Sequence, residues 1–178
     1  MTIDATQVRV ASDGRIRIAP VGTTAPADAT TAPAVAWTDL GYATDDGVTI
    51  TPGMATDDIA AWQSSVPVRR IVTGSSLEIG FTLIQSNAET LSIYFNATAD
   101  GDVLTIPTSP VPYETALLVD WLDAGVAHRL YVARAQLSDR GDLTLSRGSA
   151  VGLDMTFSAL PNGSSPDLAT VILPPVAP

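Results

Sequence analysis

The stretch Leu77-Glu78-Ile79-Gly80-Phe81-Thr82-Leu83 decides the fold class of this chain. Its large apolar side chains alternate with polar or small residues, so the apolar ones all point to the same side of an extended strand. Such alternation is typical of a half-buried β-strand. We expect this strand to occupy the segment from about Val68 to Gln85.

An α-helix is expected directly after this strand, over Asn87–Phe95. Ser86 or Asn87 can cap its first turn, and Glu89 lies in that turn, where the helix dipole favours a carboxylate. At helical spacing one face is apolar and carries Leu91, Tyr94 and Phe95. We therefore expect the helix to pack against a sheet.

Short alternating runs on both sides of this region predict further strands and a mainly β fold. With seven to nine strands and one or two helices, the natural packing is a two-sheet β-sandwich or open barrel with one flanking helix. The expected strands are Val8–Val10 and Arg15–Ile18 as a hairpin, Trp37–Tyr42, Val48–Thr51, Val103–Ile106, Glu114–Leu122, Val126–Ala135, Gly152–Leu160 and Thr170–Leu173.

A chain of 178 residues is expected to form one domain over residues 1–178. We expect an N-terminal hairpin and arm over residues 1–36 and a Pro-rich C-terminal extension over 161–178. Residues 45–70 are expected to hold a long irregular connection. In this connection Asp45-Asp46-Gly47 marks a turn, Pro52-Gly53 breaks a strand, and a short helix begins at Thr56. Connections of this length usually carry function or contacts.

Composition excludes several classes of function. The chain has no Cys, no Lys and one His, and its formal net charge is −10. These absences remove thiolate metal sites, Schiff-base and Walker lysines and a basic surface for gripping nucleic acid. Mean hydropathy is +0.24, yet apolar runs such as Ala116–Val119 are far too short for a membrane span. No secretory signal is expected.

Few residues suggest catalysis or a cofactor. His128 lies in a strand pattern without a visible catalytic partner, and the three glutamates, Glu78, Glu89 and Glu114, each have a structural explanation. The pairs Asp45-Asp46 and Asp57-Asp58 offer carboxylates of the kind that bind calcium, but turn and capping chemistry explains them without metal. We therefore expect no enzyme activity, no metal and no cofactor.

Trp62 is the best candidate for an anchor between subunits, because a long connection offers an aromatic residue little core to bury in. Arg69 and Arg70 either pair with acids of a neighbouring subunit or form a solvated strand start. The residues expected at contacts between subunits or stacked rings are Asp45, Asp46, Asp57, Asp58, Trp62, Arg69 and Arg70.

A series of short motifs, in one order over about residues 37–160, resembles the major tail proteins of bacteriophages with long non-contractile tails. The series is closest to versions from phages of actinobacteria, and a lysine-free, Ala/Thr/Asp-rich composition suits a GC-rich genome. The motifs are Asp39-Leu40-Gly41-Tyr42, Asp45-Asp46-Gly47-Val48-Thr49, Ala61-Trp62-Gln63-Ser64, Pro67-Val68-Arg69, Phe81-Thr82-Leu83-Ile84, Glu89-Thr90-Leu91, Arg129–Gln136 and Leu145-Ser146-Arg147-Gly148.

The resemblance implies a structural protein of the virion tail, assembled in the host cytoplasm. Six subunits would form a ring, and rings would stack head to tail into a tube around a tape-measure protein, ending at terminator and tip proteins. Genomic DNA would later pass through the bore without specific binding, and no membrane would be a partner. The long connection over residues 45–70 would contact neighbouring subunits and the next ring.

Charge fits this interpretation, because six chains at −10 each carry −60 per ring, and an acidic bore repels phosphates. Four acids on polar strand faces are candidates for the bore: Glu78, Asp120, Asp123 and Asp154. Two other functions stay open from the residues alone. One is a sugar- or host-binding β-sandwich of a tail tip or decoration protein, and the other is a hydrolase on a β scaffold.

Overall fold

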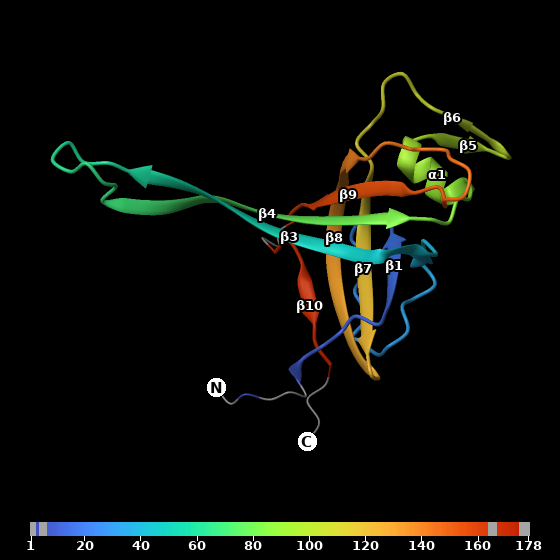
Figure 1. The fold of residues 1–178 in the computed structure, drawn as a ribbon, viewed down its shortest axis with the longest axis horizontal. Helices are drawn as coiled ribbons and strands as arrows, with labels where there is room; N and C mark the ends of the chain where they lie inside the picture. Colours follow the sequence, from blue (N-terminus) through green and yellow to red (C-terminus); the bar gives the residue numbers. More distant parts are fainter. Residues whose placement is uncertain (1–2, 4–6, 164–166, 175–178) are drawn as a thin grey trace.

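The computed structural model describes residue 3, residues 7–163 and residues 167–174, and it confirms the mainly β fold (Figure 1). These residues form ten strands and one helix. The elements are β1 (Asp13–Ala19), β2 (Thr38–Asp39), β3 (Ala43–Ile59), β4 (Arg69–Leu83), α1 (Ala88–Phe95), β5 (Thr98–Asp100), β6 (Val103–Thr105), β7 (Glu114–Asp123), β8 (Val126–Arg140), β9 (Leu153–Ala159) and β10 (Thr170–Ile172).

Eight of the strands form one antiparallel sheet that bends over itself. Its order is β2-β1-β7-β8-β9-β4-β3, with β10 paired to β8, while β5 and β6 form a separate hairpin. The long β8 joins both halves, because its first part pairs with β7 and β10 and its last part pairs with β9. In Figure 1 the half with β9, β4 and β3 crosses in front of the half with β1, β7 and β8. Among the described residues no ladder joins β1 to β3, so the arrangement is a sandwich-like open sheet and not a closed barrel.

The core lies between the two halves of this sheet. The alternating face of β4 is buried as the sequence predicts, with Ile79, Phe81 and Leu83 nearly inaccessible to solvent. Phe81 stacks on Phe157 of β9 with ring centroids 5.6 Å apart. The predicted strand over Gly152–Leu160 is confirmed as β9, whose inward residues are completely or nearly buried.

The predicted helix is confirmed, and Asn87 is its cap. The Asn87 side chain accepts a hydrogen bond from the Thr90 backbone N–H at 2.8 Å, and the Thr90 hydroxyl accepts one from the Asn87 N–H at 3.0 Å. This reciprocal capping gives hydrogen-bond partners to two backbone N–H groups, those of Asn87 and Thr90, at the start of the helix. Tyr94 is buried, and its hydroxyl donates to the Gly141 carbonyl at 2.5 Å, which ties α1 to the segment before β9.

The expectation of an irregular connection with a short helix at Thr56 is wrong. β3 runs without interruption from Ala43 to Ile59 and pairs with β4 along its whole length. Asp45-Asp46-Gly47 forms a bulge within β3 rather than a turn, and Gly47 adopts a φ of 70° there. Pro52 does not break the strand, because β3 is the last strand of the sheet and needs no ladder hydrogen bonds on its free edge.

The expected N-terminal hairpin is also wrong, because residues 8–10 form no strand. β1 pairs with β7 instead, from Asp13 opposite Leu122 to Ala19 opposite Ala116. The expected strand at Trp37–Tyr42 shrinks to β2, whereas the strand expected at Thr170–Leu173 is confirmed as β10. Parts of the expected terminal segments, at residues 1–2, 4–6, 164–166 and 175–178, lie outside the described residues.

Residues 20–37 cover the outer face of β7 and β8. Arg129 is only 3% exposed and donates to the Asp120 carboxylate and to the carbonyl oxygens of Asp28 and Thr31. The Asp28 carboxylate accepts backbone and hydroxyl hydrogen bonds from Thr30 and Thr31, and these bonds hold the pKa of Asp28 well below its ordinary value. This segment is thus held by polar contacts, together with Trp37, which is buried against Ala116 and Leu118 of β7.

We predict that Phe157→Ala lowers the free energy of unfolding by about 3–5 kcal/mol, because it removes a fully buried ring and leaves a cavity. Urea unfolding of the purified subunit measures the change. The control is Leu145→Ala, whose side chain is 74% exposed and which should cost less than about 0.5 kcal/mol. Equal effects of the two substitutions would contradict the assigned core.

We predict that Asp28→Asn destabilises the subunit at neutral pH and loses this effect in acid. Because hydrogen bonds depress the pKa of Asp28, its stabilising contribution is complete above the ordinary value of 3.8 and is lost progressively as the pH falls from that value toward the lowered pKa. Urea unfolding of both proteins at neutral pH and below pH 3.8 tests this expectation. A difference between the two proteins that does not change with pH would refute it.

Candidate assembly surfaces

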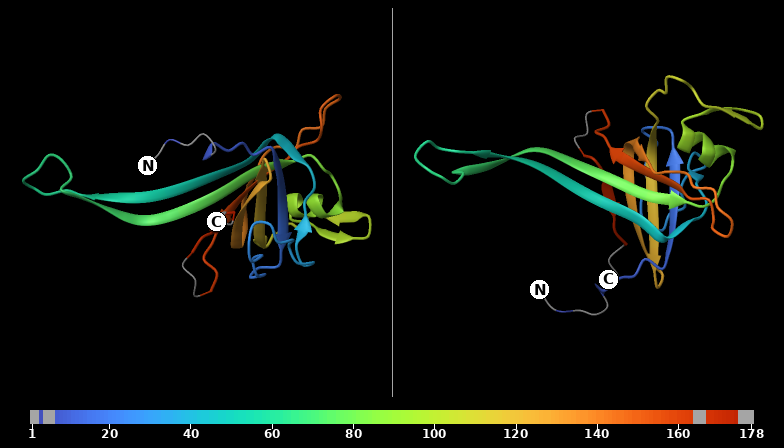
Figure 2. Two further views of the ribbon diagram at one scale, coloured as in Figure 1. Left: turned by 90° about the horizontal axis from the view of Figure 1, so that it is seen from below. Right: turned by 45° about the horizontal axis from the view of Figure 1, so that its top comes forward.

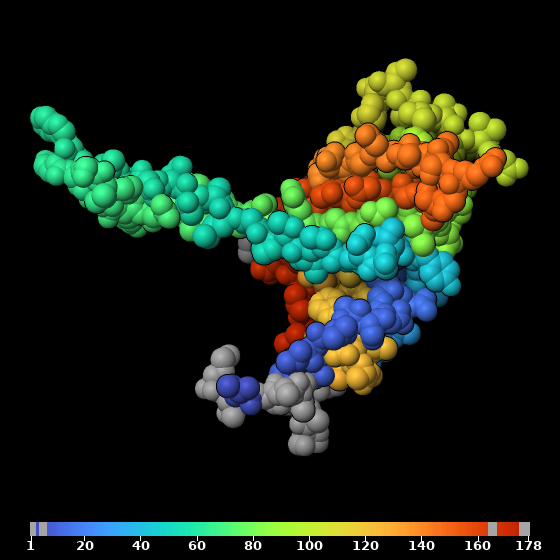
Figure 3. All heavy atoms as spheres, viewed as in Figure 1, coloured from blue at the N-terminus to red at the C-terminus, as the bar shows by residue number. Residues whose placement is uncertain are grey.

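A two-stranded arm leaves the body of the molecule. β4 pairs with β9 only over residues 78–83, and its remaining residues pair with β3 alone. We call residues 52–77 the hairpin arm and residues 60–68 at its end the tip loop. Figures 1 and 2 show the arm projecting away from the other elements, and Figure 3 shows its surface standing clear of them. An isolated two-stranded hairpin of this kind is marginally stable in water.

Large apolar side chains are exposed along the hairpin arm. Trp62, in the tip loop, is 99% exposed, and the tip loop contains no charged residue. The other large apolar side chains exposed on the arm are Met54, Ile59, Val66, Val68 and Val72. A concentration of exposed apolar groups marks an interaction surface.

Four of the charged residues expected at contacts lie just before and after the tip loop: Asp57, Asp58, Arg69 and Arg70. Arg70 donates two hydrogen bonds to the Asp58 carboxylate across the hairpin, at 2.7 and 3.0 Å. This pairing lowers the pKa of Asp58 and raises the pKa of Arg70. Neither Arg69 nor Asp57 forms an ion pair with any other described residue.

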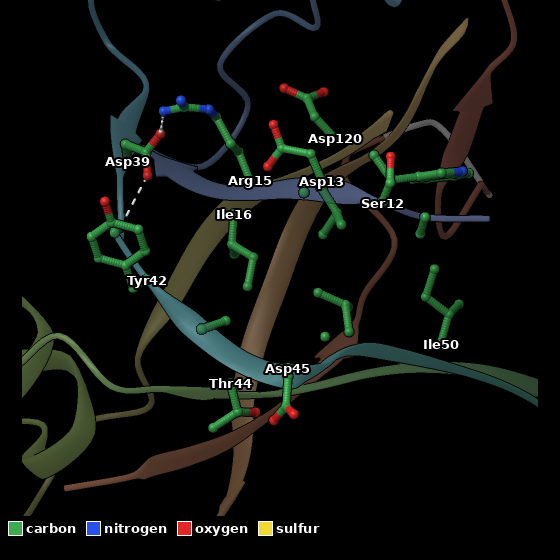
Figure 4. A pocket seen from close by; sticks show the side chains of 18 residues that line it. Ser12, Asp13, Arg15, Ile16, Asp39, Tyr42, Thr44, Asp45, Ile50 and Asp120 are labelled. Atoms are coloured by element: carbon green, nitrogen blue, oxygen red, sulfur yellow. Dashed lines mark hydrogen bonds and ion pairs between the residues drawn. The ribbon is translucent and has the colours of Figure 1, made fainter. Parts of the chain in front are cut away.

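A groove of about 710 Å³ lies where the sheet fails to close, between β1 and β3, and we call it the seam groove (Figure 4). Ile16 of β1, Val119 and Trp121 of β7, and Val48 and Ile50 of β3 contribute apolar side chains to it. Its size is within the range of ordinary binding pockets.

Two strand edges border the seam groove. β3 has β4 on one edge and no partner among the described residues on the other. β1 pairs with β7 along its length, but β2 covers only Arg17 and Ile18 on its other edge, and the N–H of Leu40 covers the Ile16 carbonyl. Unpaired strand edges are templates for pairing with another chain.

The charge of the seam groove is mainly negative. Arg15 forms an ion pair with Asp39 at 3.3 Å, and Asp39 also accepts a hydrogen bond from the Gly41 N–H. Asp13 and Asp45 also line the groove, and neither has an ion-pair partner among the described residues. Asp46 is exposed beside Asp45 in the β3 bulge.

The four acids that the sequence suggested for a bore lie in two different environments. Glu78 and Asp154 lie on the outer, polar face of β4 and β9, where Thr82 donates to Asp154 at 3.3 Å. Asp120 is held by Arg17 and Arg129, and the Asp123 carboxylate accepts from the Val10 N–H and lies 3.9 Å from Arg9.

The candidates for chemistry are dispersed. His128 stacks on Trp121 at 5.3 Å between ring centroids, and Glu114 pairs with Arg134, which lowers the pKa of Glu114. In the described part of the chain no three His, Cys, Asp or Glu residues gather as a metal site would require. No helix in that part is long and apolar enough to cross a membrane.

The sequence singled out Trp62, which is exposed, and the charged residues near it, but it did not predict the seam groove or the other apolar side chains exposed along the hairpin arm. The seam groove depends on the bending of the sheet, and this bending leaves no pattern in the local sequence. The arm had a signal that was misinterpreted, because Pro52-Gly53 and Asp45-Asp46-Gly47 interrupt an alternating pattern that continues through them.

Comparison with known proteins agrees with this architecture. No curated protein sequence matches the chain. A family model described as phage tail tube protein matches residues 1–177. The match covers nearly the whole chain, including the hairpin arm and both borders of the seam groove. The chain therefore belongs to the phage tail tube protein family, a non-enzymatic structural family of the virion tail.

Proposed function

We propose that copies of this protein form hexameric rings that stack head to tail into the tube of a long non-contractile tail, through which the genome enters the host. Membership of the tail tube family supports self-assembly. The observation that carries the proposal is the hairpin arm, whose two strands pair only with each other among the described residues and which exposes Trp62 almost completely. The lysine-free, Ala/Thr/Asp-rich composition suits a GC-rich genome, as the resemblance to proteins from phages of actinobacteria would imply.

Ring closure follows from the two open borders of the sheet. When the free edge of β3 on one subunit pairs with the exposed edge of β1 on the next, each contact uses two different surfaces. Such heterologous contacts close into a ring at a fixed rotation and remove the exposed edges. A ring of joined sheets forms one wide barrel around a bore.

The outer face of β4 and β9 suits the lining of this bore. Where these two strands pair, over residues 78–83 and 153–158, the face carries Glu78 and Asp154 among threonine and serine residues and no arginine. In this proposal Asp120 and Asp123 contribute less to the bore, because arginines already lie against their carboxylates. An acidic, lysine-free bore repels phosphates and lets DNA slide.

Stacking uses the hairpin arm and the β3 bulge. Trp62 is the anchor, Arg69 and Asp57 supply unpaired charges, and Asp58 and Arg70 stiffen the arm through their mutual ion pair. Asp45 and Asp46 offer carboxylates at the β3 bulge. The tape-measure protein inside the tube, and the terminator and tip proteins at its ends, complete the set of proposed partners.

Electron microscopy of concentrated purified protein tests this function. We expect tubes with a bore wide enough for a DNA duplex, and rings with six subunits in end-on views. Discrete particles that bind glycans through Trp or Tyr would support the rival interpretation as a sugar-binding module and would refute the tube.

We predict that Trp62→Ala leaves a folded subunit that no longer forms tubes at wild-type concentrations. A fully exposed side chain adds little to the stability of the subunit, but a buried interface anchor contributes about 2 kcal/mol or more, which is about a 30-fold rise in the critical concentration. Circular dichroism and sedimentation measure the two quantities. The matched control is Leu145→Ala, and normal tubes from Trp62→Ala would remove Trp62 from the interface.

A further inference from the structure

The chain has three asparagines, Asn87, Asn96 and Asn162, and the structure places them in different environments. In any asparagine the side-chain carbonyl carbon lies within reach of the backbone nitrogen of the next residue. Attack of this nitrogen on that carbon closes a small ring, and the reaction is favoured because both groups are held in one chain. Whether the attack occurs depends on the freedom of the side chain and of the attacking nitrogen.

Asn87 and Asn96 are both restrained. The side-chain oxygen of Asn87 accepts a hydrogen bond from a backbone N–H in the first turn of α1 at 2.8 Å. The side-chain amide of Asn96 donates to the Val111 carbonyl at 2.6 Å. The N–H of Ala97, whose nitrogen would have to attack Asn96, donates to the Ser92 carbonyl at 2.8 Å. In addition, an alanine follows each of these asparagines, and its Cβ crowds the approach of the nitrogen.

Asn162 has none of these restraints. It lies in the connection between β9 and β10, and its half-buried side chain forms no hydrogen bond with any other described residue. The next residue, Gly163, is exposed, and its N–H donates to no carbonyl in the described part of the chain. Both the side-chain carbonyl carbon and the attacking nitrogen are therefore free to react.

Gly163 also has the backbone freedom that the reaction requires. Its φ is 60°, a conformation that glycine adopts without steric cost because it has no Cβ. The Gly163 nitrogen can therefore move toward the Asn162 side chain without a clash from its own residue. Neither residue belongs to one of the ten strands, so ring closure does not disturb the ladders of those strands.

We propose that Asn162 is a site of spontaneous deamidation in the folded subunit. The Gly163 nitrogen loses its proton and bonds to the side-chain carbonyl carbon of Asn162. The bond from this carbon to the side-chain nitrogen breaks, and ammonia leaves with the proton. Water then adds to either carbonyl of the cyclic imide and opens it, which leaves aspartate or isoaspartate at position 162. Water is the only co-reactant, and nothing is oxidised or reduced.

The modification changes the charge and the main chain at one place. The new carboxylate makes the formal net charge of the chain one unit more negative than −10. The isoaspartate product also inserts a methylene group into the backbone between β9 and β10. The site lies beside the start of residues 20–37, because a Cβ built on Gly22 would lie 3.7 Å from the Asn162 side-chain nitrogen. The inference holds whether or not the subunit forms tubes.

Incubation of the purified full chain in mildly alkaline buffer, folded or in concentrated urea, tests the proposal. Mass spectrometry of the peptides measures each asparagine, because deamidation replaces an amino group by a hydroxyl group. We expect Asn162 to be lost in the folded protein at about the rate in urea, and Asn87 and Asn96 to stay intact in the folded protein. The rate at Asn162 should rise with pH, because base removes the proton from the attacking nitrogen.

Retention of Asn162 in the folded protein would overturn the proposal, and so would loss of Asn87 or Asn96 at the same rate as Asn162. Asn162→Gln is the matched variant, because it keeps an amide at this position but requires a larger ring. We expect it to abolish the release of ammonia that accompanies the loss of Asn162, while circular dichroism shows an unchanged fold. Release of ammonia at the wild-type rate from this variant would place the reaction elsewhere in the chain.

Discussion

The ladder between β4 and β9 supports both halves of this molecule. Over residues 78–83 it brings Phe81 onto Phe157 and holds the crossing half of the sheet against the half with β1 and β7. Before residue 78, β4 has β3 as its only partner among the described strands. The same strand therefore belongs to a well-packed core at one end and to an arm without a core at the other. This division gives the subunit a rigid body and an extension that needs another surface.

The open sheet and the exposed arm are complementary features of one chain. A closed barrel would have no free edges, but it would also have no surface for ordered addition of further copies. Here β1 and β3 stay apart, β3 carries the hairpin arm outward, and the seam groove lies between them. The buried guanidinium of Arg129 is provided with partners, because it contacts Asp120 and the carbonyls of residues 28 and 31. The surfaces left unsatisfied in the subunit are the ones that assembly would use.

Much of the fold was predictable where one strand or one helix carries a complete local pattern. The alternation in Leu77–Leu83 and Leu153–Ala159 identified β4 and β9, and Asn87 with Glu89 identified the start of α1. Prediction failed where local signals have two meanings. Asp45-Asp46-Gly47 has the composition of a turn but forms a bulge, and Pro52-Gly53 has the composition of a strand break but lies on an edge strand. The sequence of a strand does not reveal whether it has a neighbouring strand on one edge or on both.

The sequence by itself determined the class of fold, the lack of thiol and lysine chemistry and the acidic charge, and it singled out Trp62 as an aromatic residue outside the core. These properties depend on residue type and short-range spacing. Only the tertiary structure decided that residues 52–77 form a projecting hairpin arm, that Asp120 belongs to an arginine network, and that β1 and β3 border a groove. Each of these depends on which distant strands meet when the sheet bends. The pairing of distant strands is determined by the packing of the whole core, and no single segment of the sequence contains that information.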